Sequence, residues 1–250
     1  MSARSASSGT EGLDAAWVLH RRPYGETSAL VELFTEQAGR IGAVARGAGR
    51  RGWRGVLEPF TPLLVGWCGR GELKTLIHVE AAGAPERLQG PALACGFYLA
   101  ELALRLIRRD DPHPKSWYAY GTALGRLTEG VREQALRHFE LALLEEIGYG
   151  IQLERDAEGA PVDEGRRYRY LVERGPVPSV PGSTEGVDVL GETLRRLARG
   201  DELEGSSAQE ARRLLRHVLH HHLGGRPLQS RELFRAFRDA PGPRTIQEPS

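Results

Sequence analysis

Five arginines lie close together in one short segment of the chain, where their guanidinium groups could bind phosphates. Residues 40–54 hold these arginines and no acidic residue, so fifteen residues carry +5 while the other 235 sum to −4. Gly47, Gly49 and Gly52 make the backbone flexible, and Trp53 offers a ring for stacking on a base. The segment predicts a nucleic-acid-binding loop; the alternative is a solvated basic loop without a ligand. The arginines are Arg40, Arg46, Arg50, Arg51 and Arg54.

The same segment contains a GxGxxG spacing, which is also found in dinucleotide-binding sites. Such a site needs a helix that opens at the glycines and an acidic residue about 20 residues later. Here residues 53–55 lead instead into residues 56–60 and Pro62, which have strand character. The context argues against a dinucleotide, and we expect no cofactor.

The histidines and cysteines do not predict a metal site. His217 and His221 are one helical turn apart, but no carboxylate stands at the HExxH spacing, so partly exposed helix histidines are expected at 217 and 220–222. Cys68 and Cys95 are 27 residues apart with no CxxC pair. They predict two buried thiols rather than a disulfide framework or a cysteine zinc site.

No arrangement of residues predicts a catalytic centre. The adjacent acids at 110–111 and 145–146 would point about 100° apart on a helix, so neither pair converges on one substrate atom. The chain has no GxSxG, no P-loop and no Cys/His nucleophile arrangement. We therefore expect a protein that is not an enzyme.

Length and composition indicate two modest domains of a cytoplasmic protein. The chain has 250 residues, 40% of them apolar and 27% charged, with a net charge of +1. No apolar run approaches the ~18–20 residues of a membrane span, and residues 1–14 lack the features of a secretory signal. We expect residues 1–14 to be a disordered leader and residues 241–250, with their Pro and Gly, to be a disordered tail.

The first domain, residues 15–82, has the pattern of a small β-barrel. Short apolar bursts with β-branched and aromatic residues alternate with Gly- and Pro-containing turns, which favours strands. Five short strands in about 70 residues predict a closed or half-closed antiparallel barrel, and an SH3-like barrel fits the strand count nearly as well. The predicted strands cover residues 15–20, 28–35, 40–46, 56–67 and 72–79.

The second domain, residues 83–240, has mainly helical spacing. Apolar residues recur every three or four residues around 99–106, 136–147 and 211–223, while residues 150–181 indicate an irregular hairpin excursion. Ser230 is suited to cap a last helix with an apolar stripe of Leu233, Phe234 and Phe237. Arg226, Arg231, Arg235 and Arg238 flank this stripe. They are either solvated, or they rim an apolar groove that captures an acidic peptide with an apolar end.

Several segments resemble the RecO family of DNA recombination and repair proteins. The resemblance runs in order over roughly residues 15–238. The segments in the first domain are LHRRPYGETS (19–28), LFT (33–35), GR (39–40), VARGA (44–48), LEPFTPL (57–63) and RGELKTL (70–76). Those in the second are GFYLAEL (96–102), FEL (139–141), LE (144–145), GY (148–149) and RPLQSREL (226–233).

The resemblance implies an α+β protein with an N-terminal OB-fold barrel followed by the helical domain. It implies binding of single- and double-stranded DNA, annealing of complementary strands and, with RecR, help in loading RecA onto DNA coated by single-stranded-DNA-binding protein (SSB). The acidic C-terminal tail of SSB is a further implied partner, and the implied location is the cytoplasm, at the nucleoid. The predicted DNA-binding residues are Arg40, Arg46, Arg50, Arg51, Arg54, Trp53, Arg70 and Lys74.

Some RecO-like proteins carry a four-cysteine zinc module after the position of Gly148-Tyr149, but residues 150–181 contain no cysteine here, so we expect no zinc. The alternatives are an RNA- or protein-binding barrel without annealing activity and, more remotely, a metal-dependent hydrolase that uses the histidines near residue 220. A strand-annealing assay and a nuclease assay with divalent metal distinguish these functions.

Overall fold

The barrel has five strands and is closed. A computed structural model of the chain describes residues 12–48, 53, 55–130, 133–179 and 185–239. The strand order around the barrel is β1-β2-β3-β5-β4, with antiparallel pairs throughout except for β3 and β5, which run parallel. This confirms the expected OB-type barrel. The strands are β1 (Asp14–Tyr24), β2 (Ser28–Thr35), β3 (Gly39–Ala45), β4 (Pro62–Cys68) and β5 (Leu73–Ala81).

Alternating side chains fill the barrel interior, as the period of two along each strand requires. Val18, Val31, Leu33, Ile41 and Leu63 are among its fully buried residues. The strand predicted over residues 15–20 is longer in the structure, because backbone pairing with β2 continues to Tyr24 although the side chains beyond Leu19 are exposed. The strand predicted over residues 56–67 begins only at Pro62.

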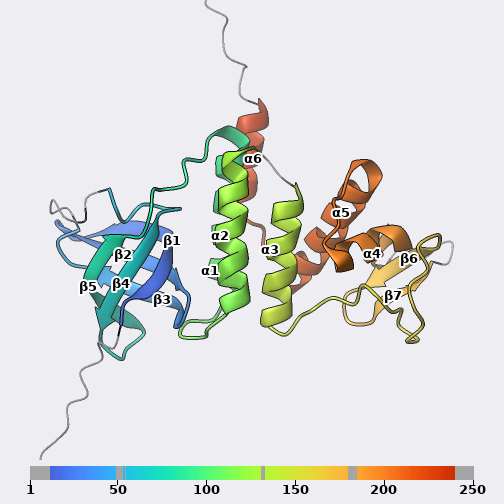
Figure 1. The fold of residues 1–250 in the computed structure, drawn as a ribbon, viewed down its shortest axis with the longest axis horizontal. Helices are drawn as coiled ribbons and strands as arrows, with labels where there is room; N and C mark the ends of the chain where they lie inside the picture. Colours follow the sequence, from blue (N-terminus) through green and yellow to red (C-terminus); the bar gives the residue numbers. More distant parts are fainter. Residues whose placement is uncertain (1–11, 49–52, 54, 131–132, 180–184, 240–250) are drawn as a thin grey trace, which may run out of the picture.

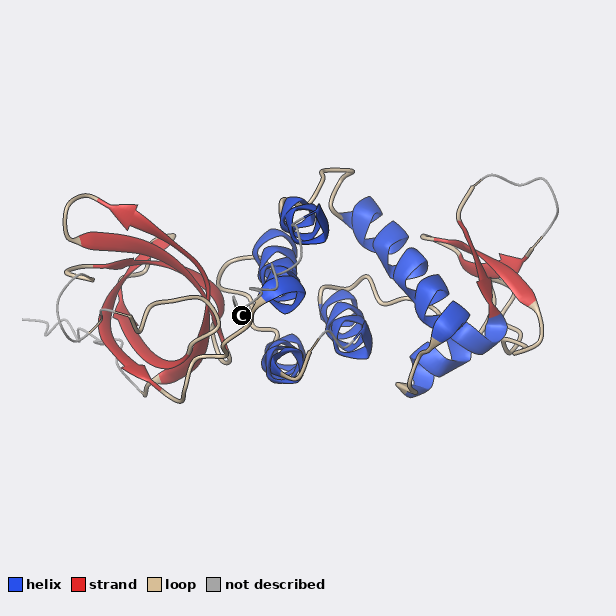
Figure 2. Cartoon of the chain, turned by 90° about the horizontal axis from the view of Figure 1, so that it is seen from above, coloured by secondary structure: helices blue, strands red, loops and turns tan. Residues whose placement is uncertain are grey.

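The helical part forms a bundle beside the barrel and carries a small sheet at its far end (Figures 1 and 2). Proline starts α1 and α2, where its missing N–H costs no intrahelical bond. The helices are α1 (Gly90–Leu106), α2 (Pro114–Thr128), α3 (Glu133–Glu146), α4 (Gly191–Arg199), α5 (Gly205–His222) and α6 (Ser230–Asp239). The sheet has the order β7-β6-β8, with strands β6 (Arg167–Leu171), β7 (Gly175–Pro178) and β8 (Val187–Leu190). The expected hairpin excursion is therefore a three-stranded sheet whose last strand lies beyond residue 181.

Aromatic side chains pack the barrel onto the bundle. Tyr120 of α2 is fully buried, and its ring contacts Trp17 of β1, Phe34 of β2 and Phe139 of α3 at centroid distances of 6.0, 6.2 and 5.7 Å. Gly121 admits the indole of Trp17, since a Cβ at that position would lie 3.0 Å from the ring. One continuous core thus extends from the barrel wall into the helices.

Polar contacts reinforce this junction. Trp117 Nε1 donates to the carbonyl oxygen of Phe34 at 3.0 Å, and Tyr118 donates to Glu36 at 2.7 Å. Gly39 has φ +72°, and a Cβ there would lie 1.9 Å from the carbonyl oxygen of Asp111. The start of β3 and the loop between α1 and α2 therefore meet backbone to backbone. Among the described residues, no helix is long and apolar enough to cross a membrane.

Candidate nucleic-acid interface

The strand register places basic, aromatic and aliphatic side chains together on the outer face of the barrel. Arg22 of β1 pairs with Leu30 of β2, Leu30 pairs with Val44 of β3, and Val44 pairs with Thr75 of β5. Side chains two residues apart share a face of a sheet, so Tyr24 lies on the same side as Arg22. The start of β3 bonds to the loop between α1 and α2 through Arg40, so Val44 and its neighbours in the ladder lie toward the other end of that strand.

A hollow of about 510 Å³ opens at this end of the face. Its walls come from both ends of the β1–β2 turn and from the end of β3. Tyr24 is 53% exposed, and Arg22 and Arg46 are exposed without an ion pair to any described residue. A phenol beside two free guanidinium groups suits a nucleobase next to phosphates. The lining residues are Tyr24, Thr27, Ser28, Val44, Arg46 and Gly47.

The predicted arginine loop leaves the barrel directly at this hollow. Arg46 follows β3 and is exposed as predicted. Arg50, Arg51 and Arg54 lie outside the described residues, so their part in the site stays a prediction. Trp53 is half-buried and packs against the barrel core, so its ring is less available for stacking than the sequence suggests.

Arg40, at the start of β3, and Lys74, in β5, both bond to the loop between α1 and α2. Arg40 donates to Glu32 at 2.9 Å and to the carbonyl oxygen of Ile107 at 2.8 Å, and its side chain is 17% exposed. The Lys74 ammonium lies 3.0 Å from an Asp110 carboxylate oxygen, with the side chain 10% exposed. The structure does not bring these two residues together with Arg46, and a phosphate would compete there with carboxylates.

Two members of the site were missed from the sequence, and one predicted residue lies apart from it. Tyr24 and Arg22 were missed because Pro23 suggested that the strand had already ended. The available signal was an aromatic residue that directly follows two arginines and a proline. A proline does not exclude a strand, because the unpaired edge of a sheet tolerates it. Arg70 is exposed in the turn between β4 and β5 and forms no ion pair with a described residue.

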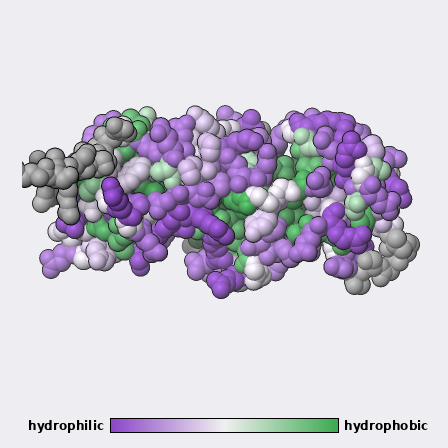
Figure 3. Space-filling view, turned by 90° about the horizontal axis from the view of Figure 1, so that it is seen from below, coloured by the Kyte–Doolittle hydropathy of each residue, from purple (hydrophilic) through white to green (hydrophobic). Residues whose placement is uncertain are grey.

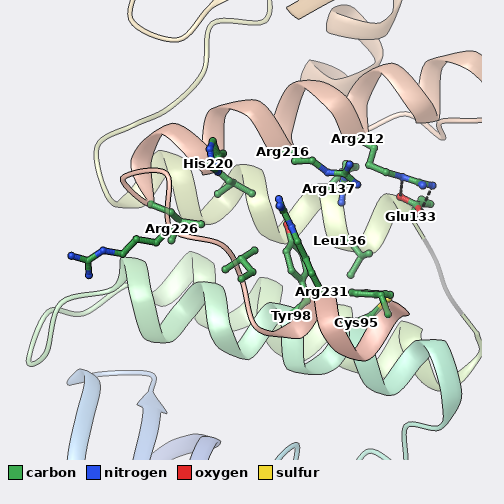
Figure 4. Close-up of a pocket in the computed structure, with 14 residues that line it drawn as sticks. Cys95, Tyr98, Glu133, Leu136, Arg137, Arg212, Arg216, His220, Arg226 and Arg231 are labelled. Carbon is green, nitrogen blue, oxygen red and sulfur yellow. Dashed lines mark hydrogen bonds and ion pairs between the residues drawn. The ribbon is translucent and has the colours of Figure 1, made fainter. Parts of the chain in front are cut away.

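A second hollow, of about 580 Å³, lies among α1, α3, α5 and α6 (Figure 4). Its apolar wall consists of Leu136, Leu219, Leu223, Leu228 and Phe234. Its polar lining is predominantly basic, and Figure 4 shows Arg137, Arg216 and Arg231 around the central space while Arg212 pairs with Glu133. Of the four arginines expected around an apolar groove at the last helix, Arg226 and Arg231 line this hollow. The side chains of Arg235, Phe237 and Arg238 lie outside the described residues.

A buried ion pair supports the floor of this hollow. Glu140 is fully buried and accepts hydrogen bonds from Arg137 at 2.7 Å and from the Tyr98 hydroxyl at 2.6 Å. Burial raises the pKa of the Glu140 carboxyl, and the nearby Arg137 guanidinium and Tyr98 hydroxyl oppose that shift. Desolvation likewise raises the pKa of Tyr98 well above its usual value. The pair therefore fixes Arg137 at the edge of the groove.

The histidines lie at the C-terminal end of α5 and do not converge. His222 stacks on Tyr149 with ring centroids 4.0 Å apart, and His221 lies 3.9 Å from a Glu173 carboxylate oxygen. Desolvation lowers the pKa of His217 and of His222. Across the described part of the chain, no three His, Cys, Asp or Glu side chains are grouped to hold a metal ion.

Comparison with known proteins covers almost the whole chain. Residues 12–84 match the family model for the N-terminal domain of recombination protein O, and residues 87–232 match the model for its C-terminal domain. A DNA repair protein RecO from Halorhodospira halophila is 56% identical over 228 residues, covering 90% of this chain and 97% of the relative. One from Alkalilimnicola ehrlichii is 52% identical over 238 residues, covering 94% and 95%. The two-domain match and these identities show that the chain belongs to the RecO family of DNA repair proteins.

Proposed function

We propose that this protein binds single- and double-stranded DNA, anneals complementary strands and, together with RecR, assists the loading of RecA onto SSB-coated DNA. Family membership supports a role in DNA repair and recombination. The observation that carries the proposal is the hollow on the barrel face, which Tyr24 and Arg46 line, with Arg22 on the same face of β1. Neither arginine forms an ion pair with a described residue. The protein would act by binding alone and would catalyse no covalent reaction. Its proposed location is the cytoplasm, at the nucleoid.

Annealing follows from charge neutralisation and exposed bases. Two DNA strands repel each other, and arginines that bind their phosphates reduce this repulsion while the base edges stay free to pair. Tyr24 would hold a base by stacking, which tolerates any sequence. Binding is therefore expected to be independent of sequence and strongly dependent on salt.

The test of the DNA site compares Arg22→Ala/Arg46→Ala with a charge-matched control, Arg174→Ala/Arg213→Ala. All four arginines are exposed, and those of the control lie in the β6–β7 turn and on α5. We expect the first variant to lower the salt slope of single-strand binding by about 1.4, at about 0.7 per lost phosphate contact, and to slow annealing. An unchanged slope would contradict the site. If the wild-type protein binds DNA but does not accelerate annealing of complementary strands, the barrel is a binding module without annealing activity.

The hollow in the helical domain supports the acidic SSB tail as a partner. An acidic peptide with an apolar end would place its carboxylates on Arg137, Arg216 and Arg231 and its apolar end on the leucines and Phe234. Arg216→Ala should weaken binding of a synthetic tail peptide, measured by fluorescence anisotropy. Arg213→Ala is the control on the same helix, because Arg213 is exposed but does not line the hollow. Equal affinities of the two variants would exclude this site.

A further inference from the structure

The loop between α1 and α2 covers the part of the barrel's outer face that is next to the helices. Glu32 and Gly42 follow Leu30 and Val44 on that face, two residues along each strand. The Arg109 guanidinium covers Gly42, where a Cβ would lie 2.8 Å from Nη2, and pairs with Glu32. Asp110 N also donates to the carbonyl oxygen of Arg40 at 2.9 Å. The outer face therefore continues from the barrel onto the helical domain.

Exposed arginines lie on both sides of this contact. Arg108 precedes Arg109 in the loop, is exposed and forms no ion pair with a described residue. The β4–β5 turn, which carries Arg70, lies beside the same loop, because Arg109 Nη1 lies 3.5 Å from the carbonyl oxygen of Glu72 and Lys74 pairs with Asp110. Arg70 and Arg108 thus flank the domain junction from different domains.

The segment that carries a third exposed arginine, Arg226, is bound at the C-terminal end of α1. Arg105 Nη1 donates to the carbonyl oxygen of Pro227 at 3.0 Å, and Glu101 accepts from the backbone N–H groups of Gln229 and Ser230. These bonds fix the segment before α6 on α1. Arg226, from this segment, is exposed and lines the edge of the hollow, and in Figure 4 its guanidinium is directed outward from the other labelled side chains.

Most acids at the junction already have a cation. Glu32 pairs with Arg40 and Arg109, Asp110 pairs with Lys74, and Glu101 pairs with Arg105. Glu72 and Asp111 are the remaining acids of the β4–β5 turn and the α1–α2 loop, and Asp111 lies 3.4 Å from His113. Glu36, at the β2–β3 turn, accepts from the Tyr118 hydroxyl. Figure 3, seen from below, shows strongly hydrophilic residues gathered where the barrel meets the helices.

We propose that a single strand of nucleic acid bound on the barrel continues across the domain junction, with Arg70, Arg108 and Arg226 as its phosphate contacts. The proposal rests on the proposed DNA binding and extends its site onto the helical domain. Such a track lengthens the site beyond the one barrel and ends beside the groove proposed for the SSB tail. Its contacts are to phosphates, so it adds affinity without sequence preference.

The test measures how affinity depends on strand length. Arg108→Ala/Arg226→Ala, with Arg174→Ala/Arg213→Ala as the control, is titrated against oligothymidylates of 8 and 30 nucleotides without SSB. We expect unchanged affinity of the Arg108/Arg226 variant for the 8-mer. For the 30-mer we expect affinity weaker on the order of tenfold at low salt, with a salt slope smaller by about 1.4. The control should bind both lengths like the wild type.

Three results would overturn the track: unchanged binding of the 30-mer, equal weakening on both lengths, or equal weakening in the control. The Arg22/Arg46 variant separates this failure from failure of the barrel site. If that variant weakens 8-mer binding while the Arg108/Arg226 variant binds normally, the barrel site stands and the track is wrong. Adding Arg70→Ala should weaken the 30-mer further and leave the 8-mer unaffected.

Discussion

Removing the carboxyl of Glu140 should destabilise the helical domain strongly. Glu140 is 0% exposed and Arg137 is 6% exposed, and the carboxylate also accepts the Tyr98 hydroxyl. Glu140→Ala leaves a buried guanidinium without its anion and a buried hydroxyl without its acceptor. Loss of one partner of a buried ion pair costs about 3–5 kcal/mol. In a chain of this size each kcal/mol of lost stability lowers the melting temperature by about 2–4 °C, so the melting temperature should fall by about 6–20 °C.

The assay is denaturant unfolding combined with a thermal melt. The comparison variant Arg137→Met/Glu140→Leu replaces the pair with apolar side chains of similar volume, so most of the stability should return. If Glu140→Ala lowers the free energy of unfolding by less than about 1 kcal/mol, the Arg137–Glu140 pair is not desolvated. The double variant should also fail to bind the SSB tail peptide although it is folded, which separates the binding role of Arg137 from its structural role.

Three further changes test other parts of the fold. Gly39→Ala should cost at least about 3 kcal/mol in chemical unfolding, because it combines a positive φ with a backbone clash; Gly25→Ala has a similar φ and open space, so about 1–2 kcal/mol is expected there. Asp14→Ala should cost about 1–3 kcal/mol, since its buried carboxylate accepts two backbone N–H groups of the β2–β3 turn. Folding lowers the pKa values of His217 and His222, so the unfolded chain binds more protons than the folded chain just below pH 6.5. The free energy of unfolding therefore decreases as the pH is lowered through this range. His217→Gln/His222→Gln should flatten the fall in melting temperature between pH 7 and pH 5; an identical fall in both proteins would contradict these shifts.

Local patterns were sufficient for the elements but not for the contacts between them. The alternation around Val31 and Leu33 and the helical spacing around Leu99 and Leu102 predict a strand and a helix because both depend on neighbours in sequence. The length of β1 was missed because hydrogen bonds to β2, rather than apolar side chains, continue it. Backbone pairing leaves no trace in the hydropathy of the exposed residues.

The candidate site illustrates the same limit. Charge clustering grouped Arg40 with Arg46, although the two lie at opposite ends of β3. What distinguishes them is the partner of Arg40 in the loop after α1, the carbonyl of Ile107, which is 67 residues away in the chain. Similarly, the basic hollow draws its walls from four helices, and only their packing shows that Arg137 and Arg231 share it.

The packed junction holds the outer face of the barrel and the helical groove next to each other. Tyr120 joins both domains in one core, and Trp117, Arg40 and Arg109 connect the barrel to α2 and to the loop before it. Relative motion of the domains would have to break these contacts together. If the groove binds the SSB tail as proposed, it would keep that SSB, and the strand that SSB covers, at a high effective concentration near the barrel. Flexibly linked domains would spread that strand over a larger volume, so under the proposed function we expect the packed junction to contribute to capture of SSB-coated DNA.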